Sequence, residues 1–536
     1  MKGNKLRAAT LIFGKMSIMP KYLIVALVLV YSTTVFAQKG KSPDPVTYAK
    51  SITPEDLKKH LYIVAGPEME GRETATPGQK MAASYIEAQF KTLGLTPGNG
   101  NGYQQPYPVF EDSVVAAAIE VNGKKFELYK DFNVNAGVNH SATIFAGEVV
   151  FAGNGIVDST RNDYAGIAAA GKVVLVFQSA PPAPPTGGGG ARTRIFRPYA
   201  LQEAAAKNGA AALLVVSAAN SPRRPMATMN NLYVNGYRET VYPNSYMITD
   251  SVAAAILGNK YEALKEAAKK GNAQPQSIKG EYMLSFNKMT KRKESSNVIG
   301  FLEGTDLKDQ YLVITAHYDH LGKRKEDNTI YFGADDDGSG TVSVLELAEA
   351  FTKAKAAGAG PRRSIIFMTV SGEEKGLWGS AYYGDHPLFS LDKTTADLNI
   401  DMIGRIDPKR TYGDSTNYVY VVGDDKLSSD LKPISESVNN KYTKLELDYK
   451  YNDPKDPERI YFRSDHFNFA RKGVPILFYF NGTHADYHRP TDTPDKINYT
   501  QMAKRAQLVF YTAWEMANRN EMLKRDIPLD TQFMGR

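Results

Sequence analysis

The chain contains, at residues 311–320, the stretch YLVITAHYDH, in which a short apolar run ends in two histidines and an aspartate. Comparable apolar runs occur at residues 364–368 and 475–479. Nearly continuous apolar runs of this length are typical of strands that are buried on both faces of a parallel sheet. Residues 341–351 and 499–516 have the apolar periodicity of helices. The alternation predicts an α/β domain with a mixed, mainly parallel central sheet flanked by helices.

Side chains that bind metal ions follow the predicted strands at the point where each strand ends. They belong to His317 and Asp319, to Asp335, Asp336 and Asp337 ahead of a helix, to Glu373 and Glu374, to Asp401, and to Asp486 and His488. In open α/β sheets, ligands bind in the crevice outside the carboxyl ends of the strands. One such residue alone is usually a helix cap or a solvated acid, but several carboxylates in one crevice repel each other. Divalent cations would remove that repulsion, so the pattern indicates a metal centre.

Cysteine is absent from all 536 residues. This excludes disulfides, thiol nucleophiles and thiolate metal sites, so any metal must be held by His, Asp and Glu. That ligand set suits Zn²⁺, with Co²⁺ or Mn²⁺ as possible substitutes. Hydrophobic residues make up 42% and charged residues 23%, as in a globular protein. The length exceeds one ordinary core and predicts two domains or a large insertion.

The first 37 residues have the pattern of a secretory signal peptide. Five basic residues and no acidic one lie within residues 1–21, an apolar run follows at residues 22–31, and Ala37 is a small residue of the kind found at cleavage sites. The apolar run is shorter than the roughly 20 residues that a membrane span needs. We therefore expect cleavage near Ala37, export to the periplasm or the outside, and no stable membrane anchor. Without those five charges the net charge of +7 becomes about +2, which gives no electrostatic case for nucleic-acid binding.

The middle of the chain has a different pattern of predicted secondary structure from the rest. Short β-like runs lie at residues 147–151, 172–177 and 211–216, with an alanine-rich helix expected at residues 201–208. The proline and glycine of residues 181–190 predict an exposed loop. We predict a signal peptide at residues 1–37, a discontinuous sheet domain at residues 46–113 and 290–520, an inserted β-rich domain at residues 114–289, and a C-terminal tail at residues 521–536.

Five motifs follow one another along the chain, namely His317-x-Asp319, Gly333-Ala334-Asp335-Asp336, Glu373-Glu374, Asn399-x-Asp401-Met402 and Tyr487-His488. This set resembles that of the co-catalytic di-zinc exopeptidases, a family that includes bacterial leucyl aminopeptidases, glutamate carboxypeptidase and the transferrin receptor. The segment Glu70-Gly71-Arg72-Glu73 resembles the family's N-terminal region. Residues 171–174 and 207–210 resemble the protease-associated domain that many members carry as an insertion. The resemblance implies a zinc-exopeptidase fold of the phosphorylase/hydrolase-like type.

The resemblance also implies a role for each matching residue. His317 and Asp401 would hold one Zn²⁺, Glu374 and His488 would hold the second, and Asp336 would bridge the two ions. Two cations lower the pKa of a shared water, which makes a metal-bridged hydroxide available near neutral pH. Glu373 would act as the general base and acid, and Asp319 would orient the imidazole of His317.

Four further residues have a weaker basis. Tyr487 is either a donor to the developing oxyanion or part of the pocket wall. Asp465 and His466 lie in a segment that resembles one lining the family's pocket, so they are candidates for binding or supporting the substrate. Arg405 either binds a substrate carboxylate or braces a loop. His320, which closes the opening stretch, is not expected to be a ligand.

The expected function is that of an exported zinc-dependent aminopeptidase, which hydrolyses the N-terminal residues of peptides. A metallo-carboxypeptidase or dipeptidase of the same fold is the alternative, because the direction of cleavage depends on which substrate charge the pocket recognises. Two other kinds of protein share the zinc-exopeptidase fold, namely metal-free receptors and single-zinc acyl transferases of the glutaminyl-cyclase type. The complete set of five ligands and a base argues against both. Peptides are the expected partners, and the sequence assigns no oligomeric state.

Overall fold

The computed structural model describes residues 44–134, 136–158, 161–178, 200–216, 231–233, 242–453 and 455–529. The predicted signal peptide at residues 1–37, the proline- and glycine-rich run at residues 181–190 and the last seven residues of the predicted tail lie outside the described residues. Within the described ranges, no helix combines the length and the apolar character that crossing a membrane requires.

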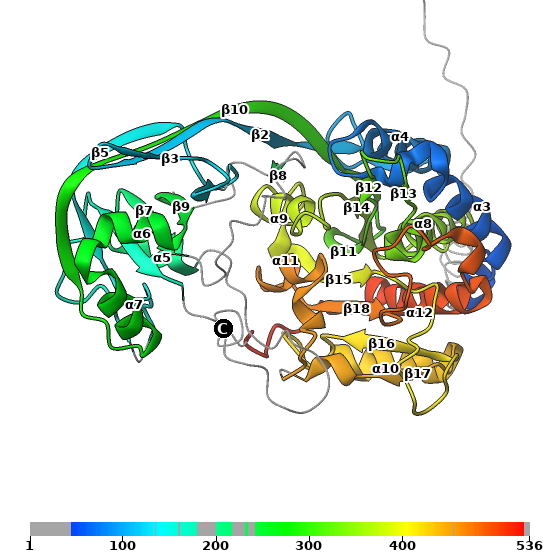
Figure 1. Ribbon diagram of the computed structural model, residues 1–536. Coiled ribbons are helices and arrows are strands. Elements are labelled where there is room, and N and C mark those ends of the chain that lie inside the picture. The colour runs from blue at the N-terminus through cyan, green and yellow to red at the C-terminus, as the bar shows by residue number, and fades with distance from the viewer. Residues whose placement is uncertain are drawn as a thin grey trace, which may run out of the picture. The chain divides into compact units, whose positions relative to one another are not determined.

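The part of the chain that carries the five motifs is built on a mixed sheet with four adjacent parallel strands (Figure 1). In spatial order these are β14 (Arg363–Val370), β11 (Leu307–His317), β15 (Thr394–Ile400) and β18 (Ile476–Phe480). Antiparallel neighbours flank this block, with β10 (Gln276–Leu302) beside β14 and β16 (Tyr418–Val422) beside β18, and β17 (Glu446–Asp448) follows β16. The mixed, mainly parallel sheet that the apolar runs predicted is confirmed.

Each parallel strand sends alternate side chains into two separate apolar clusters. On β11, Leu312 and Ile314 pack into one cluster and Val313 packs into the other. Helices cover the first cluster, which contains residues of α3 (Pro54–Val64), α4 (Pro77–Thr92), α8 (Gly340–Ala356), α10 (Leu431–Tyr442) and α12 (Tyr499–Asn518). The second contains residues of α9 (Trp378–Asp385) and α11 (His466–Ala470). Burial on both faces explains why these strands are apolar throughout.

The inserted part is joined to this sheet by one long antiparallel ladder. Strand β2 (Gln104–Val121) pairs with β10 from Gln104↔Val298 to Val121↔Tyr282. Beyond it, β5 (Ala142–Phe151), β6 (Val173–Phe177), β7 (Ala212–Val216) and β9 (Asn244–Ile248) run parallel to one another around a separate apolar core. Both predicted domain boundaries, 113/114 and 289/290, therefore fall inside continuous strands.

Cross-strand ion pairs hold the charged middle of this ladder. Lys288 Nζ lies 2.8 Å from the fully buried Asp112 Oδ2, and Lys293 pairs with Glu111. Opposite charges on facing strands stabilise a sheet where apolar pairs are missing. Apolar patterning alone could not reveal this stretch as strand.

A buried carboxyl group, Glu346, lies on α8 away from the parallel strand ends. Its side chain is 1% exposed, and neither of its oxygens has a hydrogen-bond partner among the described residues. The nearest basic group is His60, whose Nε2 lies 3.6 Å away and whose Nδ1 lies 2.6 Å from Tyr85 Oη. Burial, with a smaller contribution from Glu349, raises the pKa of Glu346 to about 8. Burial lowers the pKa of His60, so both groups are neutral at pH 7.

The protonation of Glu346 predicts a pH-dependent stability. Between its ordinary pKa and about 8, folded Glu346 keeps a proton that the unfolded chain has lost, so its contribution to the free energy of unfolding falls as pH rises. The slope from one proton is about 1.4 kcal/mol per pH unit. In Glu346→Gln this slope disappears, and the melting temperature from calorimetry should decline less steeply from pH 5 to 8 than in the wild type. Parallel pH profiles would contradict the prediction. Glu303→Gln, at an exposed ion pair with Lys308, is the matched control.

Candidate metal centre and active site

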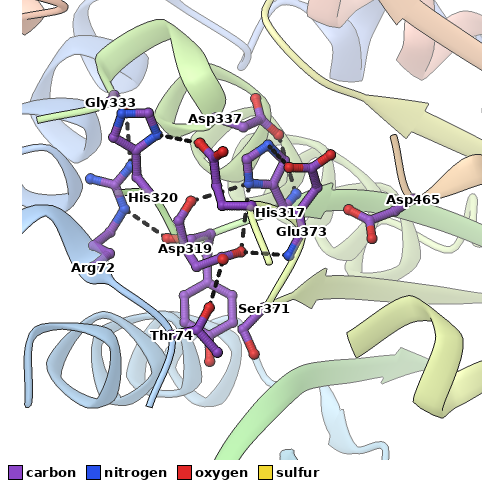
Figure 2. A network of polar contacts seen from close by, with 12 residues as sticks. Arg72, Thr74, His317, Asp319, His320, Gly333, Asp337, Ser371, Glu373 and Asp465 are labelled. Carbon is purple, nitrogen blue, oxygen red and sulfur yellow. Dashed lines mark hydrogen bonds and ion pairs between the residues drawn. The ribbon is translucent and has the colours of Figure 1, made fainter. Parts of the chain in front are cut away.

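The carboxyl ends of the four parallel strands bring the predicted site residues to one edge of the sheet. Strand β11 ends at His317, β14 is followed by Glu373 and Glu374, β15 is followed by Asp401, and β18 leads into the loop that carries His488. Asp336 comes from the turn Ala334–Ser339 that precedes α8. Figure 2 shows His317, His320, Asp337 and Glu373 converging from these elements.

The first group of potential ligands surrounds His317. Its Nε2 lies 3.3 Å from Asp336 Oδ1, 3.7 Å from Asp401 Oδ1 and 3.9 Å from Glu373 Oε2. The imidazole is 1% exposed. Burial opposes its charge, but Glu373 and Asp401 raise the pKa of His317 well above the ordinary value.

The second group surrounds Glu374. His488 Nε2 lies 3.1 Å from Glu374 Oε2 and 3.1 Å from Asp336 Oδ2. Against burial, these two carboxylates raise the pKa of His488 to about 10. The two oxygens of Asp336 thus face different groups, which is the arrangement of a residue that bridges two ions.

Several buried atoms of both groups lack any hydrogen-bond partner among the described residues. They are His317 Nε2, His320 Nδ1, Asp336 Oδ2, Glu374 Oε1 and Asp401 Oδ1. Buried polar atoms are rarely left unpaired, because the loss of hydration is costly. Cations in the two groups would satisfy all five, and imidazole nitrogens with carboxylate oxygens are ligands that Zn²⁺ accepts. The residues present therefore fit the metal centre that the motifs implied.

The neighbouring Asp337 accepts hydrogen bonds from three backbone N–H groups. Its carboxylate atoms come within 4.8 Å of ligand atoms of His317 and Asp401. Both of its oxygens are already occupied, however, since Oδ1 accepts from Gly340 N at 2.8 Å and Met402 N at 3.1 Å, and Oδ2 accepts from His317 N at 3.2 Å. Asp337 ties these three segments together, whereas Asp336 Oδ2 has no hydrogen-bond partner among the described residues.

Asp319 connects the metal ligands with Glu373. His317 Nδ1 lies 3.1 Å from Asp319 O and 3.6 Å from Asp319 Oδ1. The same Oδ1 accepts from Glu373 N at 3.2 Å, and Oδ2 accepts from Thr74 Oγ1 at 2.7 Å (Figure 2). One buried carboxylate thus fixes both the imidazole and the backbone that carries Glu373. Burial is the largest cause that raises the pKa of Glu373 well above its ordinary value, and His317 opposes it.

A pocket opens beside these groups. Its wall consists of Asp336, Glu373, Asp401, Met402, Ile460, Arg463, Phe478, Phe480, Thr483 and Tyr487. Arg463 Nη2 donates to Tyr487 Oη at 3.1 Å, and the Tyr487 ring stacks on His488 with centroids 3.9 Å apart. Sequence reasoning missed Arg463, although it directly precedes the segment Ser464-Asp465-His466 that had been singled out.

The three weakest candidates do not line this pocket. Asp465 is buried behind it and accepts from Ser380 Oγ at 2.5 Å, and burial raises its pKa to about 7. His466 Nε2 lies 2.8 Å from Tyr461 O, and burial lowers the pKa of the imidazole to about 3. Both residues support the wall from within the fold.

Arg405 likewise braces loops. Its Nη2 donates to Asp486 Oδ2 at 2.9 Å, and its Nη1 lies 3.8 Å from Asp492 Oδ1. Asp492 in turn accepts from the backbone of Asp335 and Asp336. Arg405 therefore joins the loop of His488 to the turn of Asp336, and its guanidinium is taken up by protein carboxylates rather than presented to a substrate.

A fully buried guanidinium lies under the metal centre. Arg72 donates to four backbone carbonyls, those of Tyr318 at 2.7 Å, Val64 at 2.8 Å, Phe332 at 2.8 Å and Gly333 at 2.9 Å. Burial lowers the pKa of Arg72 to about 10, while the nearby Asp319 opposes the shift, so the side chain stays charged at neutral pH. These bonds fix the strand end of His317 against the turn that leads to Asp336.

Comparison with known proteins agrees with this geometry. Residues 297–513 match the model of peptidase family M28. The chain is 30% identical over 216 residues to a "Probable leucine aminopeptidase" of Trichophyton verrucosum (strain HKI 0517), an alignment that covers 39% of this chain and 55% of the relative. It is 26% identical over 279 residues to a "Probable zinc metalloprotease" of Pyricularia oryzae, covering 45% of this chain and 53% of the relative. The chain thus spans about half the length of the curated relatives it matches.

A solved structure shares the fold. The aminopeptidase from Aneurinibacillus sp. strain AM-1 superposes with a TM-score of 0.52 at 18% identity, over 91% of this chain and 99% of that chain. The family match covers the four parallel strands and the five motif positions whose side chains form the two ligand groups. Residues 297–513 of this chain are thus similar to peptidase family M28.

Proposed function

We propose that the protein is a zinc-dependent aminopeptidase that removes N-terminal residues with apolar side chains from peptides. One observation carries this proposal: two groups of buried imidazoles and carboxylates share Asp336 and lie beside a pocket that also holds Glu373. The names of the Trichophyton and Pyricularia relatives agree with it.

In this proposal, the two groups would hold two Zn²⁺. His317 and Asp401 would hold the first, Glu374 and His488 would hold the second, and Asp336 would serve both. When bound, the ions supply Lewis acidity, which acidifies water and polarises the scissile carbonyl. Glu373 takes a proton from the attacking water and later gives it to the leaving amine. Asp319 holds the His317 imidazole and the Glu373 backbone in position for these proton transfers.

Tyr487 and Arg463 would act on the substrate carbonyl. Tyr487 Oη receives a hydrogen bond from Arg463 Nη2, which leaves its own proton free to be donated towards the pocket. A donor aimed at an oxygen that gains charge lowers the barrier more than it strengthens ground-state binding. We therefore assign Tyr487 to oxyanion stabilisation and Arg463 to positioning Tyr487.

The charges of the pocket favour the aminopeptidase direction. Three acids, Asp336, Glu373 and Asp401, line it, whereas Arg463 is the only cationic side chain among the described lining residues. Asp336 and Asp401 would be metal ligands, which leaves Glu373 as the lining acid that would attract a substrate ammonium. Met402, Ile460, Phe478 and Phe480 offer an apolar wall for the first side chain. The carboxypeptidase or dipeptidase alternative rests on Arg463, which could instead pair with a substrate carboxylate.

A substrate panel tests the direction. We expect hydrolysis of Leu-p-nitroanilide but not of its N-acetylated copy, because only the free amine meets the pocket acids. Chelation should lower the rate to background, and added Zn²⁺ should restore it. An N-acetyl dipeptide with a free C-terminal carboxylate is the control. Its cleavage, with the free-amine substrate left intact, would replace the proposal by the carboxypeptidase alternative.

We further propose that residues 114–289 form a protease-associated domain and that residues 1–37 direct export. The separate apolar core of the inserted part supports the first proposal. The basic and apolar pattern of the N-terminus supports the second.

A further inference from the structure

A third imidazole, that of His320, lies in the second ligand group. The residue is fully buried, and its Nδ1 lies 2.8 Å from Glu374 Oε1 and 3.9 Å from Asp336 Oδ2. Ligand atoms of these three residues all fall within 4.8 Å of one another. Glu374 is therefore flanked by two imidazoles, with His320 at one carboxylate oxygen and His488 at the other.

The contact between His320 and Glu374 does not have the geometry of a hydrogen bond. Despite their 2.8 Å separation, Nδ1 and Oε1 both remain without a hydrogen-bond partner among the described residues. The carboxylate oxygen lies away from the direction in which the ring nitrogen would donate. Two lone-pair-bearing atoms that are close together and do not point at each other are arranged as ligands of a common cation.

We propose that His320 Nδ1 is a ligand of the second ion, together with Asp336, Glu374 and His488. The ring centroids of His320 and His488 lie 6.0 Å apart. A zinc–nitrogen bond of about 2.0–2.1 Å puts each ring centre about 3.2 Å from the ion, so two rings on one ion have centres about 5.2 Å apart at the tetrahedral angle and at most about 6.4 Å apart. The observed 6.0 Å lies between these two values. The proposal rests on the two-ion site and adds a nitrogen to one half of it.

The surroundings fix the His320 ring in this position. Gly333 packs on it so closely that a Cβ at residue 333 would come 2.4 Å from His320 Cγ. On the other side, His320 N donates to Arg72 O at 3.3 Å. Figure 2 shows Arg72, Gly333 and His320 lying together. A ring held by its backbone and by a glycine needs little reorganisation to bind a metal ion.

The two ions would then differ in their ligands. The first would have one imidazole, from His317, and the second would have two, from His320 and His488. Because imidazole is a better ligand for zinc than for hard cations, the second position should retain Zn²⁺ more strongly and discriminate more sharply against Mg²⁺ or Ca²⁺. A chelator should therefore remove the ions in two steps.

The first experiment uses the untagged wild-type protein loaded with Zn²⁺. Elemental analysis gives the number of ions, and X-ray absorption at the zinc edge gives the number of imidazoles around them. We expect two ions per chain and a total of three imidazoles bound to them. Fewer than two ions would overturn the two-ion site itself. Two ions with only two imidazoles would overturn the role of His320 alone. This measurement needs no variant, so a folding defect cannot obscure it.

The second experiment compares variants by competition for Zn²⁺ with a chromophoric chelator. His320→Gln should weaken one of the two ions by more than about 100-fold, above the 10–100-fold that loss of an orienting partner costs. When Co²⁺ replaces Zn²⁺, the visible absorption spectrum of His320→Gln should differ from that of the wild type only in the bands of that one ion. The proposal would be overturned if His320→Gln bound both ions as tightly as the wild type does. A loss of affinity below about 100-fold, with an unchanged imidazole signal in the X-ray absorption spectrum, would overturn it as well. His386→Gln, at an exposed histidine on the C-terminal side of α9, is the matched control and should bind both ions as the wild type does.

Discussion

Replacement of Glu373 by glutamine is expected to lower kcat on Leu-p-nitroanilide by roughly 10²–10⁴-fold, the range in which general acid–base catalysis acts. Glutamine keeps the shape of the side chain and the backbone bond to Asp319 but cannot take a proton from water. Glu373 Oε2 lies 3.9 Å from His317 Nε2, at the edge of the first ligand group and on the pocket wall. Since Glu373 is not one of the proposed ligands, both ions should remain bound.

The adjacent residue provides the contrast for this prediction. In Glu374→Gln the second group loses a charged ligand, so we expect the variant to bind one ion much more weakly. Elemental analysis of both variants, together with steady-state rates at saturating Zn²⁺, separates the two effects. If Glu373→Gln lost an ion, or kept its kcat within a few-fold of the wild type, its role as the base would be wrong.

Replacement of Arg72 by methionine is expected to destabilise the catalytic domain by about 3–5 kcal/mol, as when one partner of a buried charged network is removed. Four buried carbonyls would lose their donor, and each unsatisfied group costs about 1–3 kcal/mol before the structure relaxes. The melting temperature should fall on the order of 10 °C. Affinity for Zn²⁺ should fall as well, because Arg72 fixes the turn that carries Asp336.

Two further variants sharpen the test of Arg72. Arg72→Lys retains the charge but has fewer donors in a less suitable geometry, so its melting temperature should lie between those of the wild type and Arg72→Met. Arg362→Met removes a partly exposed arginine that pairs with Asp306 and should change stability by about 0–1 kcal/mol. A melting temperature of Arg72→Met equal to that of Arg362→Met would contradict the assigned role.

The sequence predicted the elements whose burial leaves a strong pattern. The parallel strands are recognisable because both of their faces are covered, and α8 and α12 are recognisable because their apolar residues recur at helical spacing. The site residues were found because they follow those strands. The structure brings all five predicted ligands and Glu373 to one edge of the sheet, although their roles remain proposals.

Other features depend on the tertiary structure and leave no local pattern. Arg72 was noted only as part of the segment Glu70–Glu73, and Arg463 was not noted at all. Only the fold buries Arg72 among carbonyls and points Arg463 at Tyr487. His320 was not expected to be a ligand, and the sequence alone does not fix the direction of its side chain. The backbone past β11 decides that direction, where His320 N bonds Arg72 O and the ring meets Gly333.

The ladder of β2 and β10 has a consequence for how the chain folds. It pairs Gln104 with Val298, so β2 must wait for a partner strand that is synthesised roughly 190 residues later. Closing so large a loop is entropically costly, and long-range pairing of this kind slows folding. The same β10 is the antiparallel neighbour of β14. Because β10 precedes the four parallel strands in the chain, the inserted part and its separate core emerge before β14 can pair with β10.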